Sequence, residues 1–186
     1  MRRLAAVLLL AAAACNGGGG DSPDRPADLP PIAIAPCPAA EVLLPQPSGD
    51  LPDLTVKCLG DGPAVALRRL GGVPTVLNLW ASWCGPCKEE MPALQRVNHL
   101  AGGRVRFVGV ATSDSPKGAR LAIQSTGVAY ASLEDPKGEL RRELGTVGMP
   151  TTLLIGADGK RKATLLGAKS EDEIKQAIRQ HLGVTL

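Results

Sequence analysis

The 186-residue sequence predicts an α/β domain, with a mixed central β-sheet, helices on both faces of the sheet and an N-terminal extension. Two apolar segments, 73–80 and 105–111, are typical of strands that are buried on both faces. A helical pattern follows each segment, and the chain ends with a hairpin and a further helix. This order favours parallel strands joined by helices, with an antiparallel hairpin added at the end.

Each predicted element is bounded by turn or capping signals. The predicted strands are 64–67, 73–80, 105–111, 130–133, 151–155 and 161–165, and the predicted helices are 86–101, 115–126, 138–144 and 170–182. The last two strands flank residues 156–159 (GADG), a hairpin signal. Ser170 and Glu173 predict a capping box for the final helix, and Gly183 predicts its end.

The N-terminus predicts a targeting segment. Two arginines precede an apolar run, 4–14, whose 11 residues reach only about 16 Å as a helix, against a hydrocarbon core of about 30 Å. Residues 1–14 therefore predict a secretory signal peptide and not a membrane span. Ordinary cleavage after the small residues is one outcome; the other is a segment that resembles a bacterial lipobox, with lipidation of Cys15. We expect lipidation, because a free terminal cysteine is reactive in an oxidising compartment.

A Gly- and Pro-rich segment follows this cysteine. Residues 16–50 contain five glycines and eight prolines, and such a segment cannot bury enough apolar surface to offset its ordering entropy. We interpret 15–36 as the lipidated cysteine and a flexible tether at a bacterial cell membrane, outside the cytoplasm. A disordered terminus without a spacing role is the alternative. The folded domain is then expected over 37–186, with 37–60 as its N-terminal extension.

Composition excludes some functions. Only four residues are aromatic (Trp80, Trp83, Phe107 and Tyr130), so the core must be aliphatic and platforms for stacking bases are not expected. Without residues 1–14, which hold two of the 21 basic residues, 19 basic side chains remain against 18 acidic ones. This balance leaves no basic patch, and we expect no nucleic-acid partner.

The chemistry is expected at residues 83–87 (WCGPC), where a buried strand meets a helix. Cys84 falls at the helix N-terminus, where unpaired N–H groups and the helix dipole stabilise a thiolate. Pro86 suits the first turn because it has no N–H to satisfy. Cys87, one turn further, can resolve a mixed disulfide formed at Cys84. By itself, this spacing also fits half of a zinc site.

Residues 80–87 (WASWCGPC) resemble the active-site signature of thioredoxin. The longer stretch 78–92 is similar to the membrane-anchored TlpA and ResA type of thiol–disulfide oxidoreductase, and 148–152 (GMPTT) stands at the place of that family's cis-proline loop. The resemblance runs from about residue 51 to the C-terminus. It implies a thioredoxin fold, catalysis by the two cysteines without a metal or another cofactor, and a reducing couple.

Asn78 departs from thioredoxin, which has a buried aspartate at this place. The anchored branch carries a glutamate on the helix instead, which implies a role for Glu90. Helical spacing supports this role, because Glu90 lies on the inward stripe between Cys87 and Leu94. Burial would raise the pKa of Glu90 and let it exchange a proton with Cys87. The alternative is that Glu90 reaches solvent at the helix edge.

The resemblance implies that a cis bond precedes Pro150, opposite the cysteines, although trans is the default for such a bond. The backbone of Met149 would then pair with an extended client. Trp83 is expected to form part of an apolar docking surface, with packing at the strand end as the alternative. Trp80 is expected in the core.

Cys37 and Cys58 are not needed for exchange, and leftover cysteines in an exported protein usually pair. Their disulfide would close a loop of 22 residues, contribute about 3 kcal/mol and fasten the extension to the domain. A second redox relay and a pair of metal ligands are the alternatives.

We therefore expect an exported thiol–disulfide oxidoreductase that reduces disulfides of exported proteins by attack of Cys84 and resolution by Cys87. The resemblance implies a membrane thiol donor of electrons and, as client, apocytochrome c or another haem or copper protein, which indicates cytochrome c maturation. The alternative is a Cu(I) carrier that uses the soft ligands Cys84, Cys87 and Met149. A thiol peroxidase is disfavoured, because Cys84 already has a resolving cysteine three residues away.

Overall fold

The computed structural model describes residues 29, 31–39, 42–46 and 49–186. The predicted signal peptide, Cys15 and most of the predicted tether lie outside the described residues. Within the described ranges, no helix combines the length and the apolar character that a membrane span requires.

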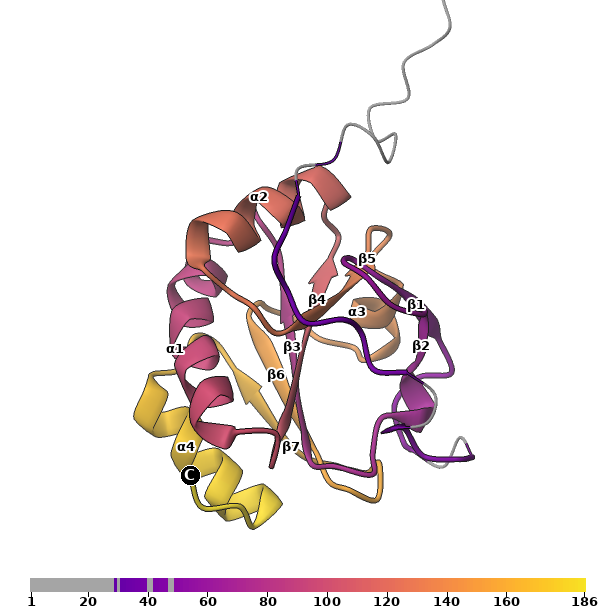
Figure 1. Ribbon diagram of the computed structural model, residues 1–186, viewed down its shortest axis with the longest axis vertical. Helices are drawn as coiled ribbons and strands as arrows, with labels where there is room; N and C mark the ends of the chain where they lie inside the picture. Colours follow the sequence, from indigo (N-terminus) through magenta and orange to yellow (C-terminus); the bar gives the residue numbers. More distant parts are fainter. Residues whose placement is uncertain (1–28, 30, 40–41, 47–48) are drawn as a thin grey trace, which may run out of the picture.

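The described residues form a seven-stranded mixed sheet with helices on both faces (Figure 1). The strands are β1 (Thr55–Cys58), β2 (Val65–Ala66), β3 (Thr75–Trp80), β4 (Arg106–Thr112), β5 (Ala131–Asp135), β6 (Thr151–Ile155) and β7 (Arg161–Leu166). The helices are α1 (Gly85–Ala101), α2 (Pro116–Thr126), α3 (Glu139–Glu143), α4 (Glu171–Leu182) and the 3₁₀ turn η3 (Leu67–Arg69).

The strand order is β2-β1-β5-β4-β3-β6-β7. The three strands β3, β4 and β5 pair in parallel, whereas β6 pairs antiparallel with both β3 and β7. The predicted mixed sheet with a terminal hairpin is therefore confirmed. The strand β3 lies in the middle of this arrangement, and the structure has all six of its residues buried.

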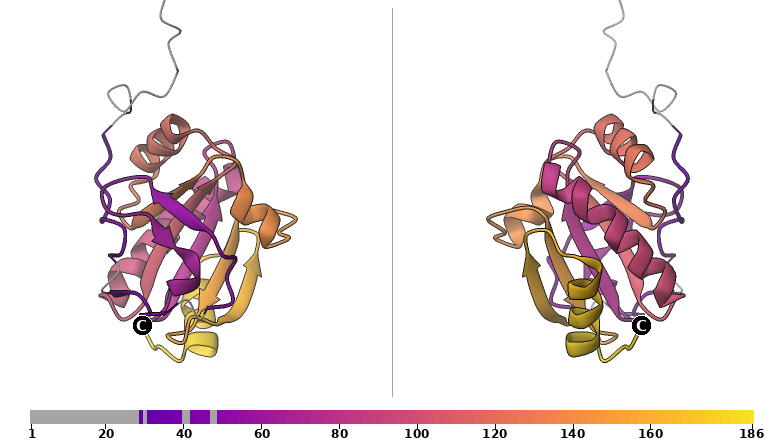
Figure 2. Two further views of the ribbon diagram at one scale, coloured as in Figure 1. Left: turned by 90° about the vertical axis from the view of Figure 1, so that its right-hand side faces the viewer. Right: turned by 90° about the vertical axis from the view of Figure 1, so that its left-hand side faces the viewer.

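Two apolar cores lie on the two faces of the sheet. One core contains Val76 and Trp80 of β3 together with the buried faces of α1, α2 and α4. The other contains Leu77 and Leu79 together with Leu140 of α3 and residues of the N-terminal extension. Figure 2 shows α1 and α4 on one side of the sheet and α3 on the other. Because both faces are covered, β3 has no polar face.

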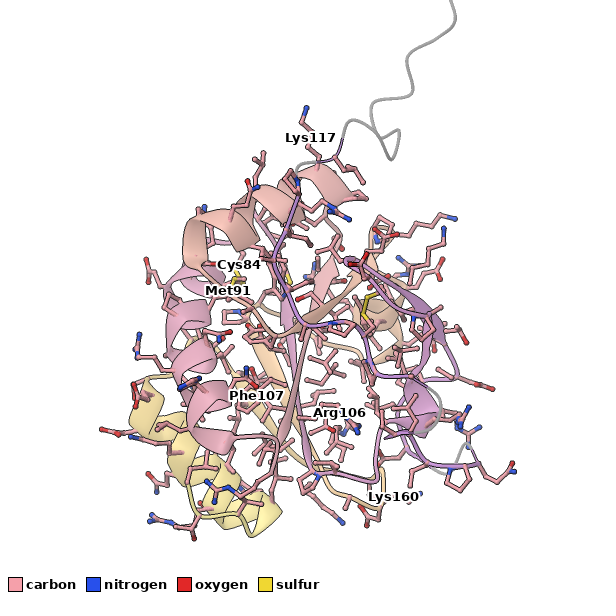
Figure 3. The ribbon with its side chains drawn as sticks, viewed as in Figure 1. Cys84, Met91, Arg106, Phe107, Lys117 and Lys160 are labelled. Carbon is pink, nitrogen blue, oxygen red and sulfur yellow. A yellow bond between two sulfur atoms is a disulfide. The ribbon has the colours of Figure 1, made fainter. Side chains whose placement is uncertain are left out.

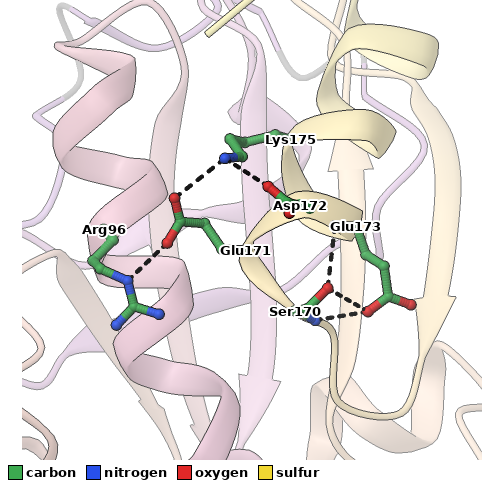
Figure 4. Close-up of polar contacts among 6 residues, drawn as sticks. All are labelled: Arg96, Ser170, Glu171, Asp172, Glu173 and Lys175. Carbon is green, nitrogen blue, oxygen red and sulfur yellow. Dashed lines mark hydrogen bonds and ion pairs between the residues drawn. The ribbon is translucent and has the colours of Figure 1, made fainter.

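The capping box predicted for the last helix is present. The Ser170 hydroxyl accepts from the backbone N–H of Glu173, while the Glu173 carboxylate accepts from the Ser170 N–H (Figure 4). Beside it, Glu171 accepts a hydrogen bond from Arg96 of α1 at 2.8 Å and pairs with Lys175 of its own helix. These contacts fix the start of α4 against α1.

The N-terminal extension differs in part from the prediction. The strand β1 lies within it, although no strand is predicted there, and it pairs antiparallel with β5. The predicted strand 64–67 is only two residues long, because the chain turns into η3 at Leu67, whose side chain enters the core. The structure also contains a disulfide between Cys37 and Cys58, with the Cα atoms 5.9 Å apart. This bond fastens the start of the extension, at Cys37, to the end of β1, which in turn pairs with β5.

Candidate active site

Cys84 and Cys87 lie where β3 meets α1. Cys84 is the N-cap of α1, and its sulfur accepts a hydrogen bond from the Cys87 N–H at 3.3 Å. The two sulfurs are bonded to each other at 2.08 Å. Figure 3 shows Cys84 towards the same end of the molecule as Lys117, away from Phe107 and Arg106. As the motif predicts, the sulfur of Cys84 lies at the N-terminus of α1.

The two sulfurs differ in exposure. Cys84 is 7% exposed, whereas Cys87 is fully buried beneath the first turn of α1. An incoming sulfur can therefore approach Cys84 but not Cys87. This asymmetry suits a pair in which one cysteine attacks and the other resolves.

Hydrogen bonds from the end of β4 hold the loop that precedes Cys84. The carboxylate of Asp114 accepts from the Ser82 N–H at 2.5 Å and from the Ser82 hydroxyl at 2.8 Å. The Trp83 indole N–H donates to the carbonyl of Ser113 at 2.9 Å. Sequence reasoning missed Ser113 and Asp114. The only signal was their place at the carboxyl end of a strand parallel to β3, an edge where sites commonly form.

The two tryptophans have different surroundings. Trp80 is fully buried in the core, as expected. The side chain of Trp83 is 60% exposed, so it is not packed at the strand end, and its hydrogen bond to Ser113 fixes the ring beside Cys84. An exposed, fixed aromatic ring is a suitable contact for another polypeptide.

Glu90 is buried on α1, one turn after Cys87, and does not reach solvent at the helix edge. One carboxylate oxygen accepts from the Asn78 side-chain amide at 3.2 Å, and the other accepts from the Lys169 N–H at 3.1 Å. Burial raises the pKa of Glu90 from 4.5 to about 7, and these two hydrogen bonds oppose the rise. Glu90 can therefore take up or release a proton near neutral pH.

Asn78 connects this carboxylate to the strand after the cis proline. Its amide also donates to the Thr152 hydroxyl of β6 at 2.9 Å, and its own carbonyl oxygen has no hydrogen-bond partner among the described residues. Where thioredoxin has an acid in the strand, this chain therefore has a donor that contacts the acid on the helix.

The peptide bond between Met149 and Pro150 is cis. The next residue, Thr151, pairs with Leu79 of β3, so this loop and the loop before Cys84 lie at the same edge of the sheet. The Met149 side chain is partly buried against the core that contains both cysteines. Among the described residues, no hydrogen bond uses the backbone N–H or C=O of Met149. That backbone can accept an added strand.

No cluster of three or more His, Cys, Asp or Glu side chains that could hold a metal occurs in the described part of the chain. Of the three ligands considered for Cu(I), Cys84 and Cys87 are bonded to each other in this structure.

Comparisons with known proteins show the family of this chain. The Redoxin family model matches residues 47–178. The thiol:disulfide interchange protein CycY of Rhizobium leguminosarum is 29% identical over 117 residues, and the match covers 62% of each chain, so this chain spans less than two thirds of CycY. The thiol:disulfide interchange protein DsbE of Xylella fastidiosa is 32% identical over 145 residues, which are 76% of this chain and 70% of DsbE.

A solved structure is also similar. It is a secreted disulfide oxidoreductase of Mycobacterium tuberculosis, described as homologous to E. coli DsbE. It superposes with a TM-score of 0.61 at 25% identity, over 69% of this chain and 96% of that one.

Proposed function

Because this chain belongs to the Redoxin family and is a thiol–disulfide oxidoreductase with a thioredoxin-like fold, we propose that it reduces disulfide bonds of exported proteins. The observation that carries the proposal is the difference between Cys84, at the tip of α1, and Cys87, fully buried behind it. The Cys84 sulfur is accessible to the client, and the Cys87 sulfur is buried beneath the first turn of α1.

The exchange proceeds in two steps. The Cys84 thiolate attacks one sulfur of the client disulfide, which breaks the client S–S bond, releases the other client sulfur as a thiolate and forms a mixed disulfide. Cys87 then attacks the Cys84 sulfur and releases the second client thiolate. The protein loses two electrons and ends with the Cys84–Cys87 disulfide, which the structure contains.

Glu90 accepts the proton that Cys87 loses in the second step. Cys87 must lose its proton to become a nucleophile, and the carboxylate of Glu90 lies one helical turn away on the same buried face. With a pKa of about 7, Glu90 is partly ionised at neutral pH and can take that proton. The side-chain amide of Asn78 holds the carboxylate in place through a hydrogen bond.

Two features are available to position the client. An extended client segment pairs with the backbone of Met149, next to the cis Pro150, and adds a short strand at the edge of the site. The exposed ring of Trp83, the residue before Cys84, supplies apolar contact. The likeness of residues 148–152 to the cis-proline loop of the TlpA and ResA type supports these roles.

We place the reaction outside the cytoplasm of a bacterial cell. The predicted signal peptide 1–14, lipidation at Cys15 and tether 15–36 would hold the folded domain, 37–186, at the cell membrane. The similar secreted oxidoreductase supports export. A membrane dithiol protein would return the two electrons, and the resemblance favours apocytochrome c as client in cytochrome c maturation.

Trapping of the mixed disulfide tests this proposal. Cys87→Ser should accumulate a covalent complex with a disulfide-containing client peptide, visible by non-reducing electrophoresis and mass spectrometry, because Cys84 attacks but nothing resolves. Cys84→Ser is the matched control and should form none, because Cys87, the remaining cysteine of the pair, is buried. Equal trapping by both variants, or trapping by neither, would refute the assigned roles.

A further inference from the structure

A small basic pocket lies beside the active site. It has a volume of about 350 Å³ and is lined by Ser113, Gly138, Arg141, Arg142, Gly145 and Thr146. The lining contains two guanidinium groups and two hydroxyls but no carboxylate, since neither Glu139 nor Glu143 of α3 takes part in it. A pocket of this composition suits an anion.

Two glycines form part of the wall of the pocket. Gly138 and Gly145 have φ angles of 67° and 63°, a region that side chains other than glycine rarely adopt. A Cβ atom at Gly138 would also collide with the Ser113 hydroxyl. The chain therefore keeps both positions without side chains and brings the Ser113 hydroxyl directly over the start of α3.

The charge of the pocket is not neutralised from within the described residues. Among the described residues, the side chain of Arg141 takes part in no hydrogen bond or ion pair. Arg142 donates only to the carbonyl of Lys137. Two adjacent arginines without an acidic partner are available to a carboxylate from outside, and a guanidinium binds a carboxylate through two parallel hydrogen bonds.

Its position indicates which molecule supplies that carboxylate. The carbonyl of Ser113 accepts the hydrogen bond from Trp83, whose ring is exposed next to Cys84. On the other side, Thr146 leads directly into Val147, which is 88% exposed, and then into Met149 and the cis proline. Ser113 and Thr146 of the lining therefore adjoin Trp83 and Val147, two exposed apolar side chains that a polypeptide docked at Cys84 can cover.

We propose that Arg141 and Arg142 bind a glutamate or aspartate side chain of the client polypeptide near its disulfide, and thereby select acidic clients. This inference rests on the proposed disulfide exchange and adds a specificity determinant to it. The arginines act on the binding of the client and take no part in the movement of electrons or protons between the sulfurs.

The test compares two synthetic peptides with one intramolecular disulfide each. The residues that flank the cysteines are glutamates in the first peptide and glutamines in the second. The reduced protein is mixed with each peptide at pH 7.5 and low ionic strength, and single-turnover rates are followed by chromatography of acid-quenched samples. We expect the glutamate peptide to react about ten-fold faster, and this preference to shrink in 1 M salt.

Substitutions locate the effect. In R141Q/R142Q the rate ratio of the two peptides should fall to about one. The matched control, K160Q/R161Q, removes two adjacent exposed basic residues at the other end of the molecule, where Figure 3 shows Lys160, and should keep the preference. The two double variants remove the same charge, so they separate local binding from a long-range electrostatic effect.

Three results would overturn the inference. They are equal rates of the two peptides with the unmodified protein, an unchanged preference in R141Q/R142Q, and a preference lost equally in K160Q/R161Q. If the unmodified protein reduces neither peptide, the proposed function itself fails, and the role of the pocket fails with it.

Discussion

The side-chain amide of Asn78 donates a hydrogen bond of 3.2 Å to the carboxylate of Glu90. This bond joins the central strand β3 to the helix that carries both cysteines, in a region from which solvent is excluded. The acid of the site therefore lies on the helix, and the strand supplies the donor that holds it. The raised pKa of Glu90 follows from its burial, and the predictions for this residue follow from that pKa.

The rate of exchange should depend on the protonation of Glu90. Single-turnover reduction of a peptide disulfide should rise with pH through an inflection near 7, the pKa of Glu90. E90Q cannot accept the proton of Cys87, so it should lose this inflection and react about 100-fold more slowly at pH 7.5. E89Q, at the exposed neighbouring position, is the control. The same pH profile in E90Q and the unmodified protein would exclude Glu90 as the base.

The stability of the oxidised protein should fall as pH rises. The pKa of Glu90 is about 7 in the folded state and 4.5 without burial, so the folded state keeps a proton that the unfolded state releases. The stability from this proton is fully present below about pH 4.5 and is lost as pH rises through 7. The loss amounts to about 3 kcal/mol.

Urea unfolding at several pH values measures this loss. The free energy of unfolding of E90Q should lack the decrease that Glu90 causes between about pH 4.5 and 7, whatever its absolute value. A glutamine has one carbonyl oxygen in place of the two carboxylate oxygens that accept from Asn78 and Lys169, so E90Q should also differ in absolute stability. The comparison therefore uses the change of the free energy of unfolding with pH. Parallel curves for the two proteins would contradict the assigned pKa.

Asp114 should position the loop before Cys84. In D114A, the backbone N–H and the hydroxyl of Ser82 lose their acceptor, so we expect client reduction to slow about ten-fold. D114N keeps one acceptor oxygen and should recover part of the rate. A purely structural role would lower stability without this graded effect on the rate, so both quantities are measured on each variant. Equal rates in all three proteins would remove Asp114 from the mechanism.

The disulfide between Cys37 and Cys58 should stabilise the fold without taking part in exchange. Replacement of both cysteines by alanine should lower the free energy of unfolding by about 3 kcal/mol, because the unfolded chain loses the constraint on a loop of this length. Reduction of a client peptide should continue at the original rate below the unfolding temperature. Loss of that activity in the folded variant would instead indicate a second redox relay.

Much of the fold is readable from local sequence. The strands β3 and β4 are mostly apolar, and α4 begins at a complete capping box, so their predicted bounds agree with the structure to within two residues. The strand β1 is different. Its only buried residue is Val56, and its partner β5 lies far away along the chain, so its four residues carry no local pattern.

The residues of the site likewise fall into a group that local sequence predicts and a group that it does not. Cys84, Cys87 and Glu90 share one helix, so their spacing alone predicts their relation. Asp114 contacts Ser82 across 32 residues of sequence. Arg141 and Arg142 line the same pocket as Ser113 because β4 and β5 are parallel and end at the same edge of the sheet. Such contacts depend on the packing of elements and leave no periodic signal in the sequence.

The reduction potential of the Cys84–Cys87 pair tests the proposed reductase most directly. The protein is equilibrated with dithiothreitol buffers of defined ratio, and the oxidised fraction is read by thiol alkylation and mass spectrometry. The Cys37→Ala/Cys58→Ala background serves as control, so that only one pair titrates. We predict a potential at or below about −250 mV, in the range of reducing couples; a value near −120 mV would identify an oxidant and contradict the account.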